Sequence, residues 1–174
     1  MSTVSKVNFE PVSDIIPLWR KDLPLADPTL ADPSNAVALV DGEWVTLNTS
    51  YKWVRASTIG SVGNAATLSS FPVFLEKGRT DRQGMAEKKT TALFTGEWEF
   101  DTRIFDASAT VGSGAAISTI LQGLKVATVT IGTRNFTGLV GHGGAADTQP
   151  IVAYVTKLPA NNGGKLRIRS GYRR

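Results

Sequence analysis

The chain has 174 residues, of which 41% are hydrophobic, with a formal net charge of +4 and no cysteine. This length suits one domain with a real hydrophobic core, and the lack of cysteine excludes disulfides, cysteine zinc sites and thiol nucleophiles. No apolar run is long enough to cross a bilayer, so we expect a soluble protein without membrane contact.

Residues 1–35 differ from the rest of the chain, because five of the eight prolines lie there. Proline fixes φ and donates no backbone hydrogen bond, so we expect an extended N-terminal arm and neither a long helix nor a central strand. The arm also carries apolar residues, which a solvated linker would not need. It either packs against its own domain or docks on a neighbouring molecule, and both possibilities stay open. In the second case the contact residues are Ile15, Ile16, Leu18, Trp19 and Leu23.

Residues 36–174 are rich in short β-strand signals. AVALVDGEWVTLN predicts a strand, an Asp-Gly turn and a second strand. Further strands are expected in SSFPVFLEKG, on both sides of the glycine turn in TTALFTGEWEFDTRIFD, and in LKVATVTI, FTGLVG, PIVAYVTKL and KLRIRS. AISTILQGL (116–124) is the one place where a short helix competes. Strands at this spacing, with 17 glycines, predict a mainly β domain, either an antiparallel β-barrel or a β-sandwich.

The final ten residues, KLRIRSGYRR, form a basic tail. They hold five of the 19 basic residues, which leaves 14 basic against 15 acidic residues elsewhere. The body is therefore close to neutral, and we do not expect direct contact with nucleic acid. The terminal Arg173 and Arg174 are candidates for contact with an acidic partner.

The triplet Gly-Glu-Trp occurs twice, at 42–44 and 96–98. Alternate side chains of a strand face opposite sides, so GEWEFDT predicts Trp98, Phe100 and Thr102 inward and its acids outward. We expect the glutamate of each triplet to face solvent beside a core tryptophan. Two carboxylates also serve glycosidases, but nothing here marks a pair across a cleft, so a solvated acidic face is favoured.

His142 is the only histidine and lies in the glycine-rich stretch GLVGHGGAAD. A zinc site would need an uncommon ligand set, and no G-x-S-x-G sequence is present to partner a catalytic histidine. No glycine cluster matches a phosphate-binding loop. We therefore expect a histidine at a turn, no metal, no cofactor and no enzymatic activity.

One pattern runs through the chain in four stretches: LVDGEWVTL, FPVFLEKGR, GEWEFDTRIFD and the closing PIVAYVTKLPANNGGKLRI. This pattern resembles that of the decoration (cement) proteins of tailed-bacteriophage heads, or of similar minor capsid proteins. The pattern covers roughly residues 37–169. Its parts are Gly42–Trp44, Pro72–Phe74, Gly96–Thr102, Val152–Thr156 and Lys165–Ile168.

The resemblance implies a virion protein without catalysis that trimerises on the capsid surface, binds the major capsid protein and holds neighbouring capsomers together. Two alternatives are kept. One is another phage head or tail completion protein of β-barrel type. The other is a carbohydrate-binding or carbohydrate-active β-domain that uses the tryptophans and acids, and it predicts that replacing Glu97 and Glu99 by glutamine abolishes activity.

Overall fold

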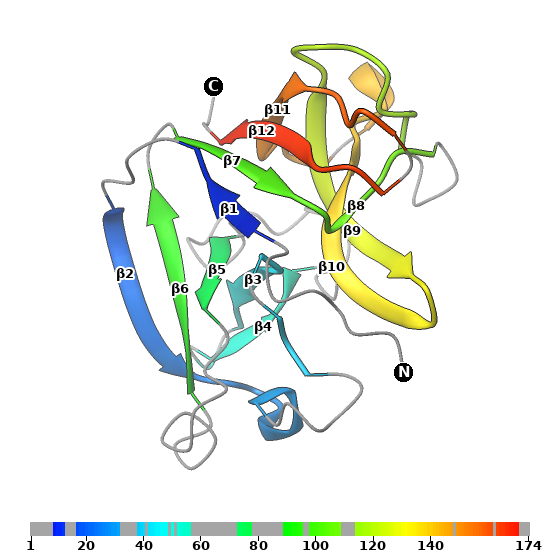
Figure 1. Cartoon of the computed structure of the whole chain (residues 1–174). Helices are drawn as coiled ribbons and strands as arrows, with labels where there is room; N and C mark the ends of the chain where they lie inside the picture. Colours follow the sequence, from blue (N-terminus) through cyan, green and yellow to red (C-terminus); the bar gives the residue numbers. More distant parts are fainter. Residues whose placement is uncertain are drawn as a thin grey trace.

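We describe the fold from a computed structural model that defines residues 9–12, 17–31, 38–40, 42–48, 50, 52–56, 73–77, 89–95, 98–108, 114–147, 149–161 and 163–170. Over these ranges the chain forms two β-sheets and two short 3₁₀ turns, η1 (Pro28–Ala31) and η4 (Gly144–Ala146) (Figure 1). Among the same residues, no helix has the length and apolar character needed to cross a membrane.

The larger sheet has seven strands in the order β1-β7-β12-β11-β9-β10-β8. Its neighbours pair antiparallel, except that β8 runs parallel to β10. The strands are β1 (Phe9–Pro11), β7 (Trp98–Thr102), β8 (Phe105–Asp106), β9 (Gly123–Ile131), β10 (Arg134–Gly141), β11 (Ala153–Lys157) and β12 (Leu166–Ser170).

The smaller sheet has five antiparallel strands in the order β2-β6-β5-β3-β4. They are β2 (Pro17–Pro24), β3 (Trp44–Leu47), β4 (Trp53–Arg55), β5 (Val73–Lys77) and β6 (Lys89–Thr95). The prediction of a mainly β protein is confirmed. The barrel alternative is wrong for the described strands, because each sheet is an open row with two edges and neither closes on itself.

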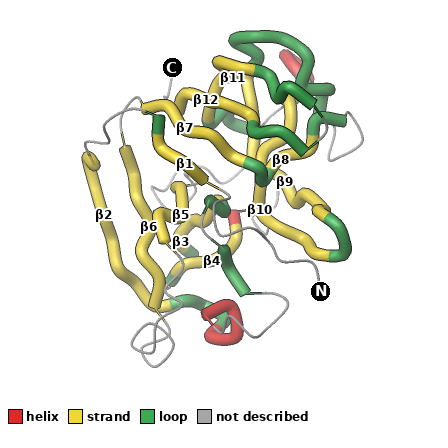
Figure 2. Tube along the Cα trace, in the orientation of Figure 1, coloured by secondary structure: helices red, strands yellow, loops and turns green. Residues whose placement is uncertain are grey.

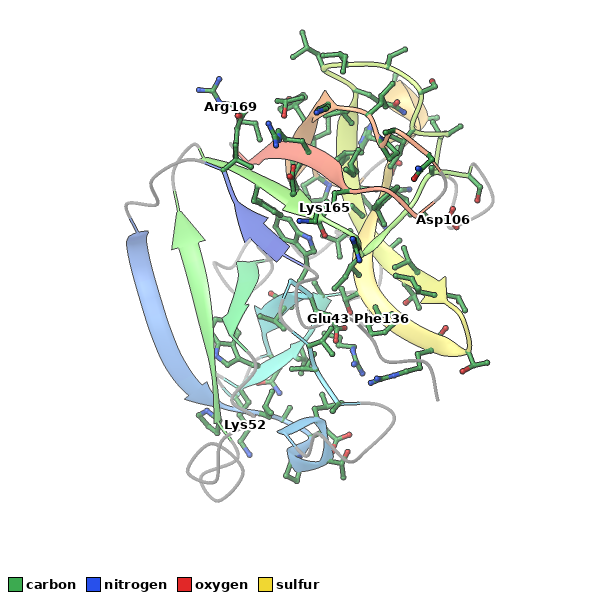
Figure 3. The ribbon with its side chains drawn as sticks, viewed as in Figure 1. Glu43, Lys52, Asp106, Phe136, Lys165 and Arg169 are labelled. Atoms are coloured by element: carbon green, nitrogen blue, oxygen red, sulfur yellow. The ribbon has the colours of Figure 1, made fainter. Side chains whose placement is uncertain are left out.

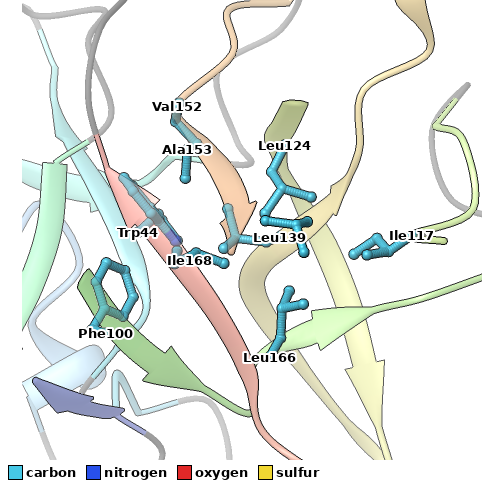
Figure 4. Close-up of a cluster of buried hydrophobic side chains, with 10 residues drawn as sticks. Trp44, Phe100, Ile117, Leu124, Leu139, Val152, Ala153, Leu166 and Ile168 are labelled. Atoms are coloured by element: carbon cyan, nitrogen blue, oxygen red, sulfur yellow. The ribbon is translucent and has the colours of Figure 1, made fainter. Parts of the chain in front are cut away.

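The main hydrophobic core joins the two sheets (Figure 4). Trp44 of β3 belongs to the same buried cluster as Phe100 of β7 and Ile168 of β12. The other buried members are Ile117, Leu124, Leu139, Val152, Ala153, Val155 and Leu166. Phe100 and Ile168 are fully buried and Trp44 is 5% exposed, so the tryptophan of the first Gly-Glu-Trp triplet packs one sheet on the other.

Several strand predictions agree with the structure. The hairpin from β11 to β12 turns through 158–165, where Gly163 has a φ of 96° as the Asn-Asn-Gly-Gly signal suggested. In β7, Phe100 and Thr102 are buried while Glu99 and Asp101 remain partly exposed, which confirms the predicted alternation for these four residues.

One local prediction is wrong, and one alternative that was left open is settled. Ala38–Val40 are not a strand, and β3 forms its hairpin with β4 instead. Gly42 does supply the expected turn, with a φ of 92°, but Glu43 N donates to the Val40 carbonyl and folds 38–43 back on itself. The short helix considered for 116–124 is absent: residues 116–122 are a loop and β9 starts at Gly123 (Figure 2).

Both chain-terminal segments contribute strands to these sheets. β1 and β2 lie within the stretch predicted to be an arm, and each is an edge strand, β1 beside β7 and β2 beside β6. Pro17 and Pro24 stand at the two ends of β2, where a missing N–H donor does least harm. At the other end of the chain, five of the ten residues of the basic segment form β12, an interior strand between β7 and β11.

Candidate functional site

Three of the five predicted contact residues of the N-terminal segment lie in a described strand. Leu18, Trp19 and Leu23 lie in β2, whose backbone is paired with β6 of the same domain. Ile15, Ile16, Arg173 and Arg174 fall outside the described residues. The structure therefore gives β2 a place in its own sheet and leaves partner contact by these side chains as a prediction.

His142 serves the loop that follows β10. Its Nδ1 accepts a hydrogen bond from Gly144 N at 3.1 Å, which assigns the proton to Nε2. Nε2 then donates to the Gln149 carbonyl at 2.9 Å. Both ring nitrogens are thus used to close residues 142–149 into a compact turn, as expected of a histidine at a turn.

A buried ion pair fixes the same loop to β9. Lys125 Nζ lies 2.6 Å from Asp147 Oδ2, and the two side chains are 1% and 4% exposed. The carboxylate also accepts hydrogen bonds from Gly143 N at 2.9 Å and Gln149 N at 3.1 Å. Burial raises the pKa of Asp147, but the hydrogen bonds from Lys125 and the two backbone donors outweigh it, so the net pKa lies below its ordinary value of 3.8.

The acids near position 100 pair with other groups of the chain. Asp101 faces Arg167 across β7 and β12, with Arg167 Nε 2.8 Å from Oδ1 and Nη2 3.2 Å from Oδ2. The hydrogen bonds from Arg167 lower the pKa of Asp101, and burial, which raises it, offsets only part of this effect. Asp106 Oδ1 accepts from both the backbone and the hydroxyl of Ser108. Glu97 lies outside the described residues.

Glu43 was predicted to face solvent, and this prediction is wrong: its side chain is fully buried. Arg55 Nε of β4 donates to Oε2 at 2.9 Å, and Arg55 Nη2 donates to Oε1 at 3.2 Å. Backbone N–H groups of Val40 and Thr137 add bonds of 3.0 Å and 2.9 Å. Because Thr137 lies on β10, this carboxylate links the two sheets (Figure 3).

The correction has a clear physical cause. The paired strand β8 reaches only Leu139 and Val140 of β10, so the Thr137 N–H lies beyond the end of that pairing and needs another acceptor. Four donors surrounding one carboxylate compensate for its removal from water. None of the donors adjoins Glu43 in the sequence, so the alternation of strand residues could not indicate the burial.

The loop before β9 carries a feature that the sequence interpretation missed. Ile120 and Leu121 are 51% and 71% exposed, and Leu121 has a φ of 64°, the one positive value found for a non-glycine residue of the described chain. Leu121 N donates to the Val155 carbonyl at 2.7 Å, which holds this backbone on β11. The only sequence signal was two adjacent aliphatic residues in a stretch of small and polar ones.

Comparisons with known proteins assign the chain to no group. No protein-family model matches it, and neither the curated proteins nor the solved structures contain a match. Among the described residues, no group of three or more histidine, aspartate or glutamate side chains is arranged to hold a metal ion. The geometry therefore has to be interpreted from its own contacts. These contacts show three ion pairs and one histidine that fasten loops and strands together.

Proposed function

We propose that the chain is a structural protein of a tailed-phage particle that binds the major capsid protein on the outside of the head. In this proposal it acts as a trimer, stabilises contacts between capsomers and carries out no catalysis. We take its two open sheets to form a sandwich, which is supported by the buried cluster that holds Trp44 of one sheet and Phe100 of the other. The sequence pattern that resembles decoration proteins is the reason for choosing this class of binding protein.

One observation supports the non-catalytic part of the proposal: His142 and Asp101, two of the groups weighed for chemistry, are engaged in holding the scaffold. Both nitrogens of His142 are bonded within its own loop. Asp101 is paired with Arg167 through two hydrogen bonds. A general acid or base has to exchange its proton with a substrate, which favours groups that are not committed in this way. A rigid β scaffold suits a protein whose task is binding.

Many copies on one shell make weak contacts sufficient. Each copy links neighbouring subunits, so the effective concentration of the second contact is set by the shell and not by free diffusion. A modest interface per copy then adds up to a large gain for the particle. The carbohydrate alternative would instead place Glu99 in a sugar-binding cleft, although its strand neighbour Asp101 is tied to Arg167.

The direct test is the number of copies in the particle. Purified heads of the phage that encodes the chain are analysed by quantitative mass spectrometry, and native mass spectrometry gives the oligomeric state of the free protein. Hundreds of copies per head and a trimer support the proposal. Six or twelve copies identify a ring component of the head or tail, and absence from the particle overturns the proposal.

A further inference from the structure

We propose that the Ile120–Leu121 turn is a preformed docking knob that inserts into an uncharged, apolar recess on the partner protein. This inference deepens the proposed function and rests on it, because the partner is taken to be the capsid subunit. It names a contact surface different from the N-terminal residues predicted from the sequence.

The first step is the combination of exposure and backbone conformation. A left-handed backbone is unfavourable for a residue with a Cβ, and glycine is the residue that adopts it freely. Leu121 therefore carries the energetic cost of a left-handed backbone, and its apolar side chain is also 71% exposed. Neither property helps the isolated domain to fold. Backbone outliers of this kind concentrate at binding and active sites.

The second step is that the loop is held in shape. Gln122 Oε1 accepts hydrogen bonds from Ser118 N at 2.9 Å and Thr119 N at 3.4 Å, and Gln122 Nε2 donates to the Ala116 carbonyl at 2.7 Å. One side chain thus bridges the backbone of residues 116, 118 and 119. Ile117, four residues before Leu121, is buried in the main core and anchors the start of the loop.

The consequence of this support is preorganisation. The ordering cost of a binding loop is met when the domain folds, so less of the contact energy is lost on association. The loop lies at the start of β9, at the end of the larger sheet away from the smaller one, where a partner surface can approach it (Figure 2).

The third step identifies the chemistry of the partner. Residues 111–124 contain no charged and no aromatic side chain. Nucleic acid would require cations for its phosphates, and a membrane surface favours basic and aromatic residues at the interface. Two adjacent aliphatic side chains on a rigid, uncharged turn instead match a small apolar recess on a protein, of the kind that anchor residues fill at the centre of interfaces.

The test uses Leu121→Gly, because glycine removes the side chain and also suits the left-handed backbone. Heads of the encoding phage, prepared without this chain, are titrated with purified full-length protein, and bound copies are counted after sedimentation. We expect the Kd of Leu121→Gly to rise by about tenfold or more, as for loss of an interface anchor. Its melting temperature should be unchanged or higher. Ile120→Ser should act in the same direction.

The matched control is Ile131→Ser, which removes an aliphatic residue of 42% exposure from the end of β9. Its Kd should stay within about twofold of wild type, as expected outside an interface centre. If Leu121→Gly binds heads with the same Kd as the wild type, the docking role of the Ile120–Leu121 turn is refuted, but the proposed function stands. Failure of the wild type to bind heads overturns the proposed function itself.

Two further measurements exclude other occupants. Flotation with phosphatidylcholine–phosphatidylglycerol vesicles should recover no wild-type protein, and recovery that is lost in Leu121→Gly would show a lipid contact and refute the inference. Sedimentation equilibrium should give the same oligomer for both proteins. Dissociation of the variant would place the turn between copies of this chain, which also refutes it.

Discussion

The buried carboxylate of Glu43 gives the sharpest prediction about stability. Glu43→Gln keeps the size of the side chain, but its amide nitrogen then meets donors where an oxygen stood, because the carboxylate accepts from Arg55, Val40 N and Thr137 N. The substitution also removes the carboxylate charge that pairs with the Arg55 guanidinium, whose side chain is only 16% exposed.

The expected loss follows from these contacts. Removing one partner of a buried ion pair costs about 3–5 kcal/mol of unfolding free energy. We expect the lower end, about 3 kcal/mol, because Arg55 keeps some solvent access and its bond to the Ala38 carbonyl, which is 3.3 Å long. With a urea m-value of about 2 kcal/mol/M, the midpoint should fall by about 1.5 M.

The assay is equilibrium urea unfolding followed by tryptophan fluorescence, with Asp101→Asn as the matched control. That substitution alters an ion pair whose partners are 31% and 16% exposed and keep more contact with water than Glu43, so it should cost less, about 1–2 kcal/mol. In a double-mutant cycle, Glu43→Gln and Arg55→Gln should couple by about 1–3 kcal/mol. If Glu43→Gln costs no more than Asp101→Asn, the assignment of Glu43 as the link between the sheets is refuted.

Three further predictions concern the loops and the sheet interior. Because the pKa of Asp147 is lowered in the folded state, its carboxylate stabilises the fold at pH values above the unfolded pKa of 3.8, and this stabilisation is lost as the pH falls through the folded pKa. The unfolding free energies of wild type and Asp147→Asn should therefore converge below pH 3.8 in urea titrations from pH 7 to pH 2.5. A constant difference between the two proteins would contradict this. Gly138→Ala places a Cβ 2.6 Å from the Ile104 carbonyl and should lower stability by about 1–3 kcal/mol in the same assay, and an unchanged midpoint would show that the sheet gives way there. His142→Ala removes two hydrogen bonds and should speed amide exchange at Gly144 by about fivefold or more, consistent with a loss of about 1 kcal/mol; unchanged exchange would mean that Asp147 alone holds the loop.

The sequence was a good guide to which segments form strands and a poor guide to how they assemble. The β9–β10 and β11–β12 strands were predicted because their apolar stretches end at turn residues, which is local information. By contrast, β6 and β7 are separated by only two residues and yet belong to different sheets. Nothing in a short glycine-containing turn indicates whether the chain folds back or crosses to another layer.

The candidate contacts were limited in the same way. The burial of Glu43 depends on Arg55 and Thr137, which lie 12 and 94 positions further along the chain, so the alternation within one strand does not indicate it. The Leu121 backbone conformation depends on Gln122 and on the Val155 carbonyl of another strand. His142 was predicted correctly as a turn residue because its glycine neighbours act locally.

The position of β12 has a consequence for biosynthesis. It is the last of the described strands in chain order, yet it lies between β7 and β11, and Leu166 and Ile168 are fully buried. Until it emerges, β1 and β7 have no strand that joins them to β9, β10 and β11. The two parts of the larger sheet can therefore unite only once residues 166–170 have left the ribosome, and a polypeptide cut short before Leu166 has unpaired strand edges on β7 and β11 that are open to aggregation.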